Sequence, residues 1–196
     1  MDKEIDLSVS CYGAVKDLHY DVAILPWGAT EPHNYHLPYL TDCIAPKMIA
    51  VKAASVALKK YGVRCMVMPP ISLGSQNPGQ RNRSFCIHVR YETQYAILTD
   101  VVASLYEQGM RKLIILNGHG GNNFKNMIRD LAFVYPDFLI VQSHWFSILP
   151  CKGYFEAEID DHAGEQETSV IMYLQPELVD LTMAGSGESQ PFAIPA

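Results

Sequence analysis

The chain has 196 residues, and its 15 lysines and arginines stand against 21 aspartates and glutamates, which gives a formal net charge of −6. With 48% hydrophobic residues and a mean hydropathy close to zero, the composition excludes a disordered chain. Lysine and arginine never occur in runs longer than two, so neither nucleic acid nor an anionic membrane is expected as a partner. The length suits one hydrophobic core, and we expect residues 1–196 to form a single domain.

The longest apolar runs, such as Leu113–Leu116 and Phe138–Val141, are far shorter than the ~20 residues that a membrane-spanning helix needs. The first ten residues carry acidic side chains where a secretory signal would be basic and then apolar. The five cysteines are an odd number and form no CxxC pair, which favours reduced thiols. We therefore expect a cytoplasmic protein.

Short apolar runs alternate with longer segments of helical periodicity, which predicts βαβ units around a mainly parallel sheet. Residues 71–85 follow neither periodicity and are expected to form a long loop, and long loops often carry function. The C-terminal residues 181–196 show no recognisable element. In chain order, the pattern predicts a strand at 22–26, a helix at 42–61, a strand at 64–68, the loop, a helix at 91–108, a strand at 112–116, a helix at 123–135, a strand at 138–142 and a helix at 165–174.

A first cluster of polar side chains directly follows the strand at 22–26. Glu31 and His33 stand two residues apart, and Asp42 opens the following helix. Ligands of open α/β sheets bind beyond the carboxyl ends of the strands, and this mixture of oxygen and nitrogen donors suits Zn, Mn or Fe. Asp42 has the alternative role of a helix cap. For His36, in the same segment, a hydrogen-bonded structural role is favoured over metal ligation.

A second cluster, NGHGGN, occupies Asn117–Asn122, between a predicted strand and a predicted helix. A phosphate-binding loop is the first alternative, but position 123 is Asn where the dinucleotide fingerprint needs Gly, and no GK[ST] follows. The glycines let the main chain approach a ligand closely, and their N–H groups suit an anionic oxygen. We interpret His119 as a metal ligand at the same edge of the sheet.

A third cluster, DDHAGEQETS, covers residues 160–169 at the start of the last predicted helix. Acidic residues in a first helical turn interact favourably with the helix dipole, which is a structural alternative for Glu165. His162, a further histidine beside acidic side chains, favours a place in the site instead. Each cluster alone is a weak signal, whereas three that converge on one sheet edge are a strong one.

The three clusters together resemble the creatininase (creatinine amidohydrolase) family, whose pattern runs roughly GxxExHxxHLPxxxD, NGHGGN and HAGxxETS. Gly28–Asp42, Asn117–Asn122 and His162–Ser169 match it in order and spacing. The resemblance implies a three-layer α/β/α fold with a mainly parallel central sheet and a site with two divalent metal ions, zinc first, with manganese or iron as alternatives. It also implies hydrolysis of a non-peptide C–N bond in a small-molecule amide or formamide, and assembly as a homo-oligomer, commonly a hexamer.

The resemblance assigns metal-binding roles to individual residues. Glu31 resembles a ligand of one ion and His33 a ligand of the other, and Asp42 resembles the carboxylate that bridges them. His119 resembles a further ligand on the Glu31 side.

The chain departs from the family pattern at several positions. In creatininase itself a glutamate two residues after that histidine binds the second ion, but this chain has Gly121 there, so we expect Glu167 to be the fifth ligand, with Glu165 as second choice. Many members carry a histidine and then a GT pair in the long loop, where this chain has Asn77 and the run Phe85–His88. From the resemblance we also expect residues 1–196 to lack the family's usual C-terminal segment.

The expected mechanism is attack on the carbonyl by a hydroxide held between the two ions. His162, or Glu165 if it is not a ligand, is expected to protonate the leaving nitrogen. The alternative is a non-catalytic metal- or ligand-binding protein with the same fold, and a serine or cysteine hydrolase is a weaker one because no GxSxG elbow is present. The residues expected to contact substrate are Tyr35, Gly120, Gly121 and Trp145, with a place in the core as the alternative for Trp145.

Overall fold

The computed structural model describes residues 3–149, 153–156 and 162–187, and these residues build a parallel sheet. The strand order is β2-β1-β3-β4, and every neighbouring pair runs in parallel. All four strands lie within two residues of the predicted ones, so the βαβ prediction is confirmed. Their bounds are β1 Val22–Trp27, β2 Cys65–Val67, β3 Lys112–Asn117 and β4 Leu139–His144.

The four long helices also occur where the sequence predicts them. The segment at 71–85 forms no helix or strand, as expected. The short α1 (Tyr12–Val15) is unexpected, and so is a 3-10 turn at Leu181–Met183 within the predicted C-terminal loop, whose residues 188–196 lie outside the described part. The helices are α2 Thr41–Tyr61, α3 Tyr91–Glu107, α4 Lys125–Val134 and α5 Glu165–Leu174.

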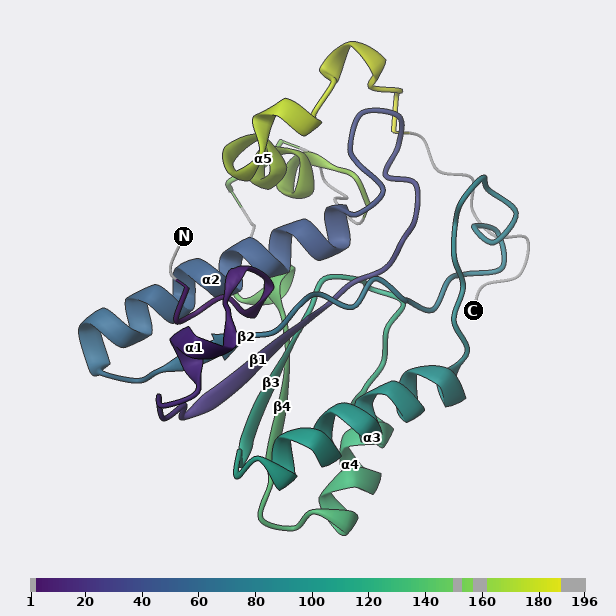
Figure 1. Ribbon diagram of the computed structural model, residues 1–196. Helices are drawn as coiled ribbons and strands as arrows, with labels where there is room; N and C mark the ends of the chain where they lie inside the picture. The colour runs from purple at the N-terminus through teal and green to yellow at the C-terminus, as the bar shows by residue number, and fades with distance from the viewer. Residues whose placement is uncertain (1–2, 150–152, 157–161, 188–196) are drawn as a thin grey trace.

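The sheet is covered by helices on both faces (Figure 1). Side chains of a strand alternate between the faces, so Ala23, Leu25 and Trp27 of β1 join the core cluster of α3 and α4. Ile24 points the other way and joins the cluster that includes residues of α2 and Ile171 of α5. The three-layer α/β/α fold is therefore confirmed.

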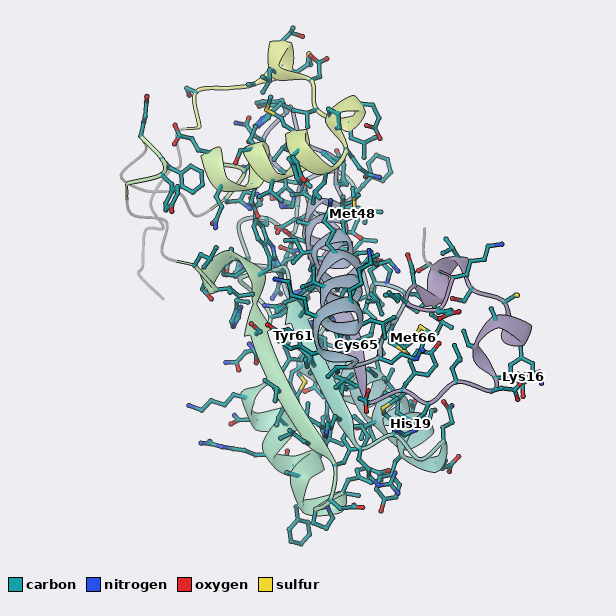
Figure 2. The ribbon with its side chains drawn as sticks, turned by 90° about the vertical axis from the view of Figure 1, so that its left-hand side faces the viewer. Lys16, His19, Met48, Tyr61, Cys65 and Met66 are labelled. Atoms are coloured by element: carbon teal, nitrogen blue, oxygen red, sulfur yellow. The ribbon has the colours of Figure 1, made fainter. Side chains whose placement is uncertain are left out.

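Helix α2 lies along one face of the sheet, and α5 packs on the half of α2 that contains Met48 (Figure 2). Gly62, in a left-handed conformation with φ of 68°, ends α2 as the sequence predicts. The first turn of α2 contains Asp42, so this carboxylate lies at the positive end of the helix dipole. Within the described residues, no helix combines the length and apolar character needed to cross a membrane.

The described cysteines are all free thiols, in line with the expected reduced state. Cys43 and Cys65 are buried, Cys86 is half-buried and Cys11 is exposed. Cys151 lies outside the described residues.

Candidate metal centre

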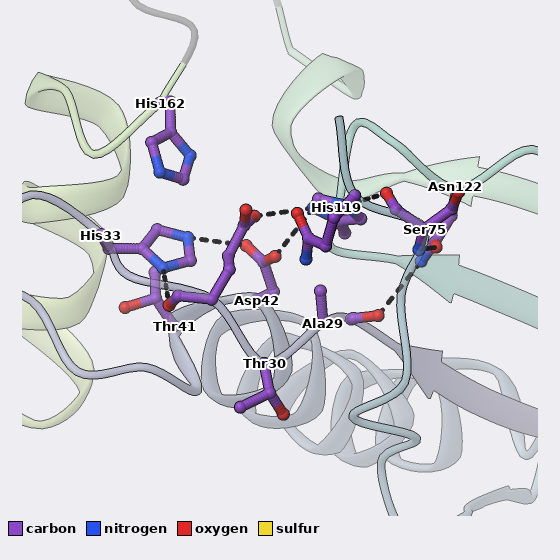
Figure 3. Close-up of polar contacts among 12 residues, drawn as sticks. Ala29, Thr30, His33, Thr41, Asp42, Ser75, His119, Asn122 and His162 are labelled. Carbon is purple, nitrogen blue, oxygen red and sulfur yellow. Dashed lines mark hydrogen bonds and ion pairs between the residues drawn. The ribbon is translucent and has the colours of Figure 1, made fainter. Parts of the chain in front are cut away.

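The polar clusters meet at the carboxyl edge of the sheet (Figure 3). The loop after β1 brings Glu31 and His33, the first turn of α2 brings Asp42, and the turn after β3 brings His119. All four side chains are buried, with exposed fractions of 3, 0, 2 and 8%. Burying ionisable groups is costly unless they are paired with one another or bind metal. A buried cluster of two acids and two imidazoles therefore calls for a functional explanation.

Asp42 is the centre of the cluster. Its Oδ1 lies 2.9 Å from His33 Nε2, and its Oδ2 lies 3.0 Å from His119 Nδ1. His119 Nδ1 is also 2.8 Å from Glu31 Oε1. Each oxygen of one carboxylate thus faces a histidine from a different loop.

Glycines at the ends of two strands allow this close approach. A Cβ atom on Gly28 would lie 2.3 Å from the Asp42 carbonyl oxygen, and one on Gly118 would lie 2.0 Å from it. Any larger residue at either position would push the first turn of α2 away from the sheet edge. The glycines of the GxxExH and NGH motifs therefore set the position of Asp42.

Backbone carbonyls fix the orientation of both imidazole rings. His33 Nδ1–H donates to the Glu31 carbonyl at 3.1 Å, and His119 Nε2–H donates to the Ser75 carbonyl at 2.8 Å. A carbonyl accepts only, so the opposite ring nitrogen of each histidine is left facing Asp42. Metal-binding histidines are held in this manner, with the second nitrogen on a carbonyl or carboxylate.

The charges in the cluster shift the pKa values of its members. Burial lowers the pKa of His33, but the hydrogen bond and charge of Asp42 outweigh it and raise the pKa to about 9. Burial is likewise outweighed at His119, where Asp42 and Glu31 raise the pKa to about 10. Burial raises the pKa of Asp42, yet the two histidines hold it well below its usual range. Both imidazoles therefore carry a proton, and with it a positive charge, beside the carboxylates at neutral pH.

Helix α5 adds Glu167 to the cluster and not Glu165. Glu167 offers an oxygen close to His33 and Asp42, and its Oε2 accepts a 2.6 Å hydrogen bond from the Ala163 N–H. Glu165 instead accepts a hydrogen bond from the Glu156 N–H at 2.7 Å. Burial raises the pKa of Glu167.

His162 lies beside the cluster on its exposed side. Its ring centroid is 4.5 Å from that of His33, and its Nε2–H donates to the Pro32 carbonyl at 2.9 Å. The neighbouring Asp160 and Asp161 of the third cluster lie outside the described residues.

Among the described residues, three groups of three side chains offer ligand atoms that lie within 4.8 Å of one another. Two of the groups share Asp42, whose bridging of two ions stays a prediction. The third group replaces Asp42 by the exposed His162. The groups are Glu31, Asp42 and His119; His33, Asp42 and Glu167; and Glu31, His33 and His162.

A network of buried amides supports the turn that carries His119. Asn117 brackets His119, accepting from its N–H at 3.3 Å and donating to its carbonyl at 2.7 Å. Asn122 donates to Asn117 and accepts from the Ser75 N–H and from Gln94 of α3. The sequence predicts neither Ser75 nor Gln94. Gln94 could have been noticed because it is a polar residue at a position of α3 that shares the buried face with apolar residues.

His36 is buried and structural, as favoured from the sequence. Its Nε2 lies 2.8 Å from the Thr168 hydroxyl of α5, so the pair ties the loop after β1 to that helix. Burial lowers the pKa of His36.

The residues expected to contact substrate occupy different environments. Tyr35 is 74% exposed, whereas Trp145 is buried in the core cluster of α2 and α5. The Trp145 indole N–H has no hydrogen-bond partner among the described residues. Gly120 and Gly121 line a cavity of about 780 Å³ beside α4, together with Lys125, Arg129, His144 and neighbouring residues.

Gly121 leaves no room for a side chain. A Cβ atom there would lie 2.2 Å from the Ser75 carbonyl oxygen and 2.6 Å from His119 Nε2. A ligand from this position would therefore displace the hydrogen bond that orients His119.

The sequence matches the family model described as creatinine amidohydrolase over residues 12–196. Among curated relatives, a mycofactocin precursor peptide peptidase from Mycobacterium ulcerans is 29% identical, covering 87% of this chain and 65% of its own length. The creatinine amidohydrolase of Pseudomonas putida is 27% identical, covering 82% and 66%. The chain thus spans about two thirds of the length of these relatives.

Solved structures extend this likeness to three dimensions. A protein from Bacteroides fragilis, provisionally named creatinine amidohydrolase, is 71% identical with a TM-score of 0.97, over 99% of this chain and 77% of that one. A mutant creatininase of the Zn–Zn type is 25% identical with a TM-score of 0.70, over 88% and 73%. The match of the family model over nearly the whole chain and these shared folds lead to one conclusion: the chain belongs to the creatininase family.

Proposed function

We propose that the chain holds two divalent metal ions and hydrolyses a non-peptide C–N bond in a small molecule, such as a cyclic amide or a formamide. One ion would be held by Glu31, Asp42 and His119, and the other by His33, Asp42 and Glu167. The observation that carries the proposal is Asp42, whose two oxygens face histidines from different loops at 2.9 and 3.0 Å. Carboxylate and imidazole donors suit zinc, with manganese or iron as alternatives.

Several features of the site support this ligand set. Both histidines already present one ring nitrogen to the carboxylates, because the other donates to a carbonyl. The space at Gly121 is filled by the Ser75 carbonyl and the His119 ring, so a fifth ligand from this turn does not fit. Glu167 supplies a carboxylate from the opposite side instead.

Two such ions, when bound, would supply a water of lowered pKa as the nucleophile and a Lewis acid for the substrate carbonyl. The chain's own residues would bind the substrate and donate the proton. His162, exposed next to His33, is the candidate to donate a proton to the leaving nitrogen, and Glu165 is the second choice. Trp145 is an expected substrate contact, but its ring and its indole N–H are both buried, which favours the alternative of a place in the core. Tyr35 would contact the substrate from the exposed side.

The names of the relatives support hydrolysis but differ in the bond. They include a creatinine amidohydrolase, a peptide peptidase and a 3-dehydro-scyllo-inosose hydrolase from Thermotoga maritima. The substrate class proposed for this chain therefore rests on the motif resemblance and the cluster. A single domain, a cytoplasmic location and a homo-oligomer, commonly a hexamer in the family, accompany the proposal as predictions.

Metal content tests the proposal directly. The chain is loaded with zinc or manganese, freed of excess metal and analysed for elements, beside the variant Asp42→Asn, which keeps the shape of the side chain but removes its charge. We expect close to two ions per chain in the wild type and one or none in the variant. Asp137→Asn, a change at an exposed ion pair with Arg111, is the matched control and should keep both ions.

Hydrolysis is then screened on cyclic amides and formamides, with and without a chelator. Activity that needs metal and is lost in Asp42→Asn supports the amidohydrolase. One ion or none in the loaded wild type would contradict the two-metal hydrolase and favour the non-catalytic binding protein.

A further inference from the structure

Phe85 combines two unfavourable features in the long loop before α3. Its backbone lies in the left-handed region with φ of 56°, which a bulky residue rarely adopts. Its side chain is 83% exposed, so the ring gains almost nothing from burial. Neither feature benefits the fold, which points to a role for the ring outside it.

The ring of Phe85 makes an aromatic contact with Tyr39. Their centroids are 6.5 Å apart with an interplanar angle of 79°, an edge-to-face contact. The Tyr39 hydroxyl donates to the Ser84 carbonyl at 2.8 Å, which fixes the contact from the residue next to Phe85. Tyr39 is 38% exposed, so the pair forms an aromatic wall that is open to solvent on one side.

Backbone hydrogen bonds place the segments that carry these two rings beside Glu31 of the candidate metal centre. The Glu31 N–H donates to the Tyr39 carbonyl at 3.3 Å, and the Ile87 N–H donates to the Thr30 carbonyl at 3.0 Å. Glu31 and its neighbour Thr30 are thus hydrogen-bonded to the segments that carry Tyr39 and Phe85. Burial raises the pKa of the neighbouring Cys86 thiol, and the charge of Glu31 raises it further, as expected for groups close in space.

We propose that Phe85, held edge-on by Tyr39, is a specificity-determining residue that contacts a planar ring of the substrate next to the bond that is hydrolysed. The inference rests on the proposed function and narrows its substrate class to amides or formamides carried on an aromatic or heteroaromatic ring. A rigid, exposed aromatic face next to a polar reaction centre suits such a ring, because stacking adds to the area that the contact buries. The backbone strain is then a cost of presenting the ring at this position.

Two hydroxamates with the same metal-binding head test the inference. Acetohydroxamate carries a methyl group and benzohydroxamate a planar ring, and both are titrated into the zinc-loaded chain by calorimetry. We expect benzohydroxamate to bind at least about tenfold more tightly, which corresponds to about 1.4 kcal/mol. In Phe85→Asn this ratio should fall several-fold while the affinity for acetohydroxamate stays the same.

Asparagine is the chosen replacement because it tolerates a left-handed backbone. The melting temperature of Phe85→Asn should therefore equal or exceed that of the wild type, which separates a lost contact from lost folding. Phe133→Ala, which removes a 90% exposed phenylalanine from α4, is the matched control and should keep the wild-type ratio.

The outcomes distinguish this inference from the proposed function. If acetohydroxamate binds but the ratio is the same in Phe85→Asn as in the wild type, the aromatic wall is contradicted and the metal centre stands. If the wild type takes up zinc but binds benzohydroxamate no more tightly than acetohydroxamate, or binds neither, this inference is contradicted. If the wild type retains no zinc after loading, the metal centre itself is contradicted, and this inference with it.

Discussion

Asp42 shows how much of the site depends on a single side chain. Its carboxylate is 2% exposed and contacts His33 through one oxygen and His119 through the other. A buried carboxylate is stable only with such partners, so the histidines and Asp42 depend on one another. Gly28 and Gly118 in turn decide whether Asp42 can come this close.

Two adjacent glycines of the NGHGGN turn allow a matched test of this packing. Gly121→Ala should place a methyl group against the Ser75 carbonyl and the His119 ring, whereas a Cβ atom on Gly120 meets nothing within 4 Å. We expect Gly121→Ala to lower the free energy of unfolding by about 1–3 kcal/mol, as overpacking does, and to weaken metal binding. Gly120→Ala should change neither by much. Urea unfolding and zinc titration measure both effects, and equal behaviour of the two variants would contradict the tight fit at Gly121.

The candidate ligands could be predicted from sequence because they stand in dense polar clusters at the ends of apolar runs. Glu31, His33, Asp42 and His119 are of this kind, and the structure brings them together with Glu167. Ser75 could not be predicted, because it acts through its backbone carbonyl, which every residue has. The contact between Tyr39 and Phe85 could not be predicted either, because it joins two loop segments that show no hydrophobic periodicity.

Helix α3 supports the site although it contributes no candidate ligand. Its buried Gln94 donates from Nε2 to Asn122 at 2.8 Å and to the Leu73 carbonyl at 3.3 Å. Asn122 holds Asn117, and Asn117 holds both the N–H and the carbonyl of His119. Helix α3 thereby fixes the turn after β3, and it does so from the face of the sheet opposite to α2.

Replacing Gln94 by Leu should therefore damage both stability and the site. The change removes one of two donors from Asn122 Oδ1 and from the Leu73 carbonyl, which keep the Ser75 N–H and the Trp27 indole N–H. Each lost hydrogen bond should cost about 0.5–1.5 kcal/mol. It should also loosen His119 and weaken metal binding at the proposed site of Glu31 more than at the proposed site of Glu167. Elemental analysis and chemical unfolding measure the two effects. Gln108→Leu, at the exposed C-terminal end of the same helix, is the control, and an equal loss there would contradict the proposed support.

Sequence patterns located the elements well and their ends less well. Helix α5 occupies the predicted Glu165–Leu174, but α4 begins at Lys125 and not at residue 123. There Asn123 Oδ1 accepts a hydrogen bond from the Lys125 N–H at 3.1 Å, a local turn that competes with the helix. β3 and β4 continue past their apolar runs because Asn117 pairs with His144, and such pairing follows from the neighbouring strand.

At the scale of the molecule, the metal-free protein buries a charged cluster whose stability depends on protons. In the folded chain the pKa of His33 rises to about 9 and that of His119 to about 10, above the 6.5 of an ordinary histidine. The folded state thus binds protons more tightly than the unfolded state. The resulting stabilisation is complete below pH 6.5 and is lost as the pH rises through about 9 and 10.

The metal-free chain should therefore unfold more easily at pH 9 than at pH 6. For His33 alone, a rise in pKa from 6.5 to about 9 is worth about 3 kcal/mol, at about 1.4 kcal/mol per pKa unit. Urea unfolding in the presence of a chelator measures this difference. His33→Gln should reduce the dependence between these pH values by roughly half, because His119 still titrates with a raised pKa. His19→Gln, at an exposed imidazole 3.8 Å from Asp21, should leave it intact. Zinc should oppose the trend, since metal replaces the protons and binds more tightly as the pH rises. A metal-free chain that is equally stable at pH 6 and pH 9 would contradict the charged state assigned to the cluster.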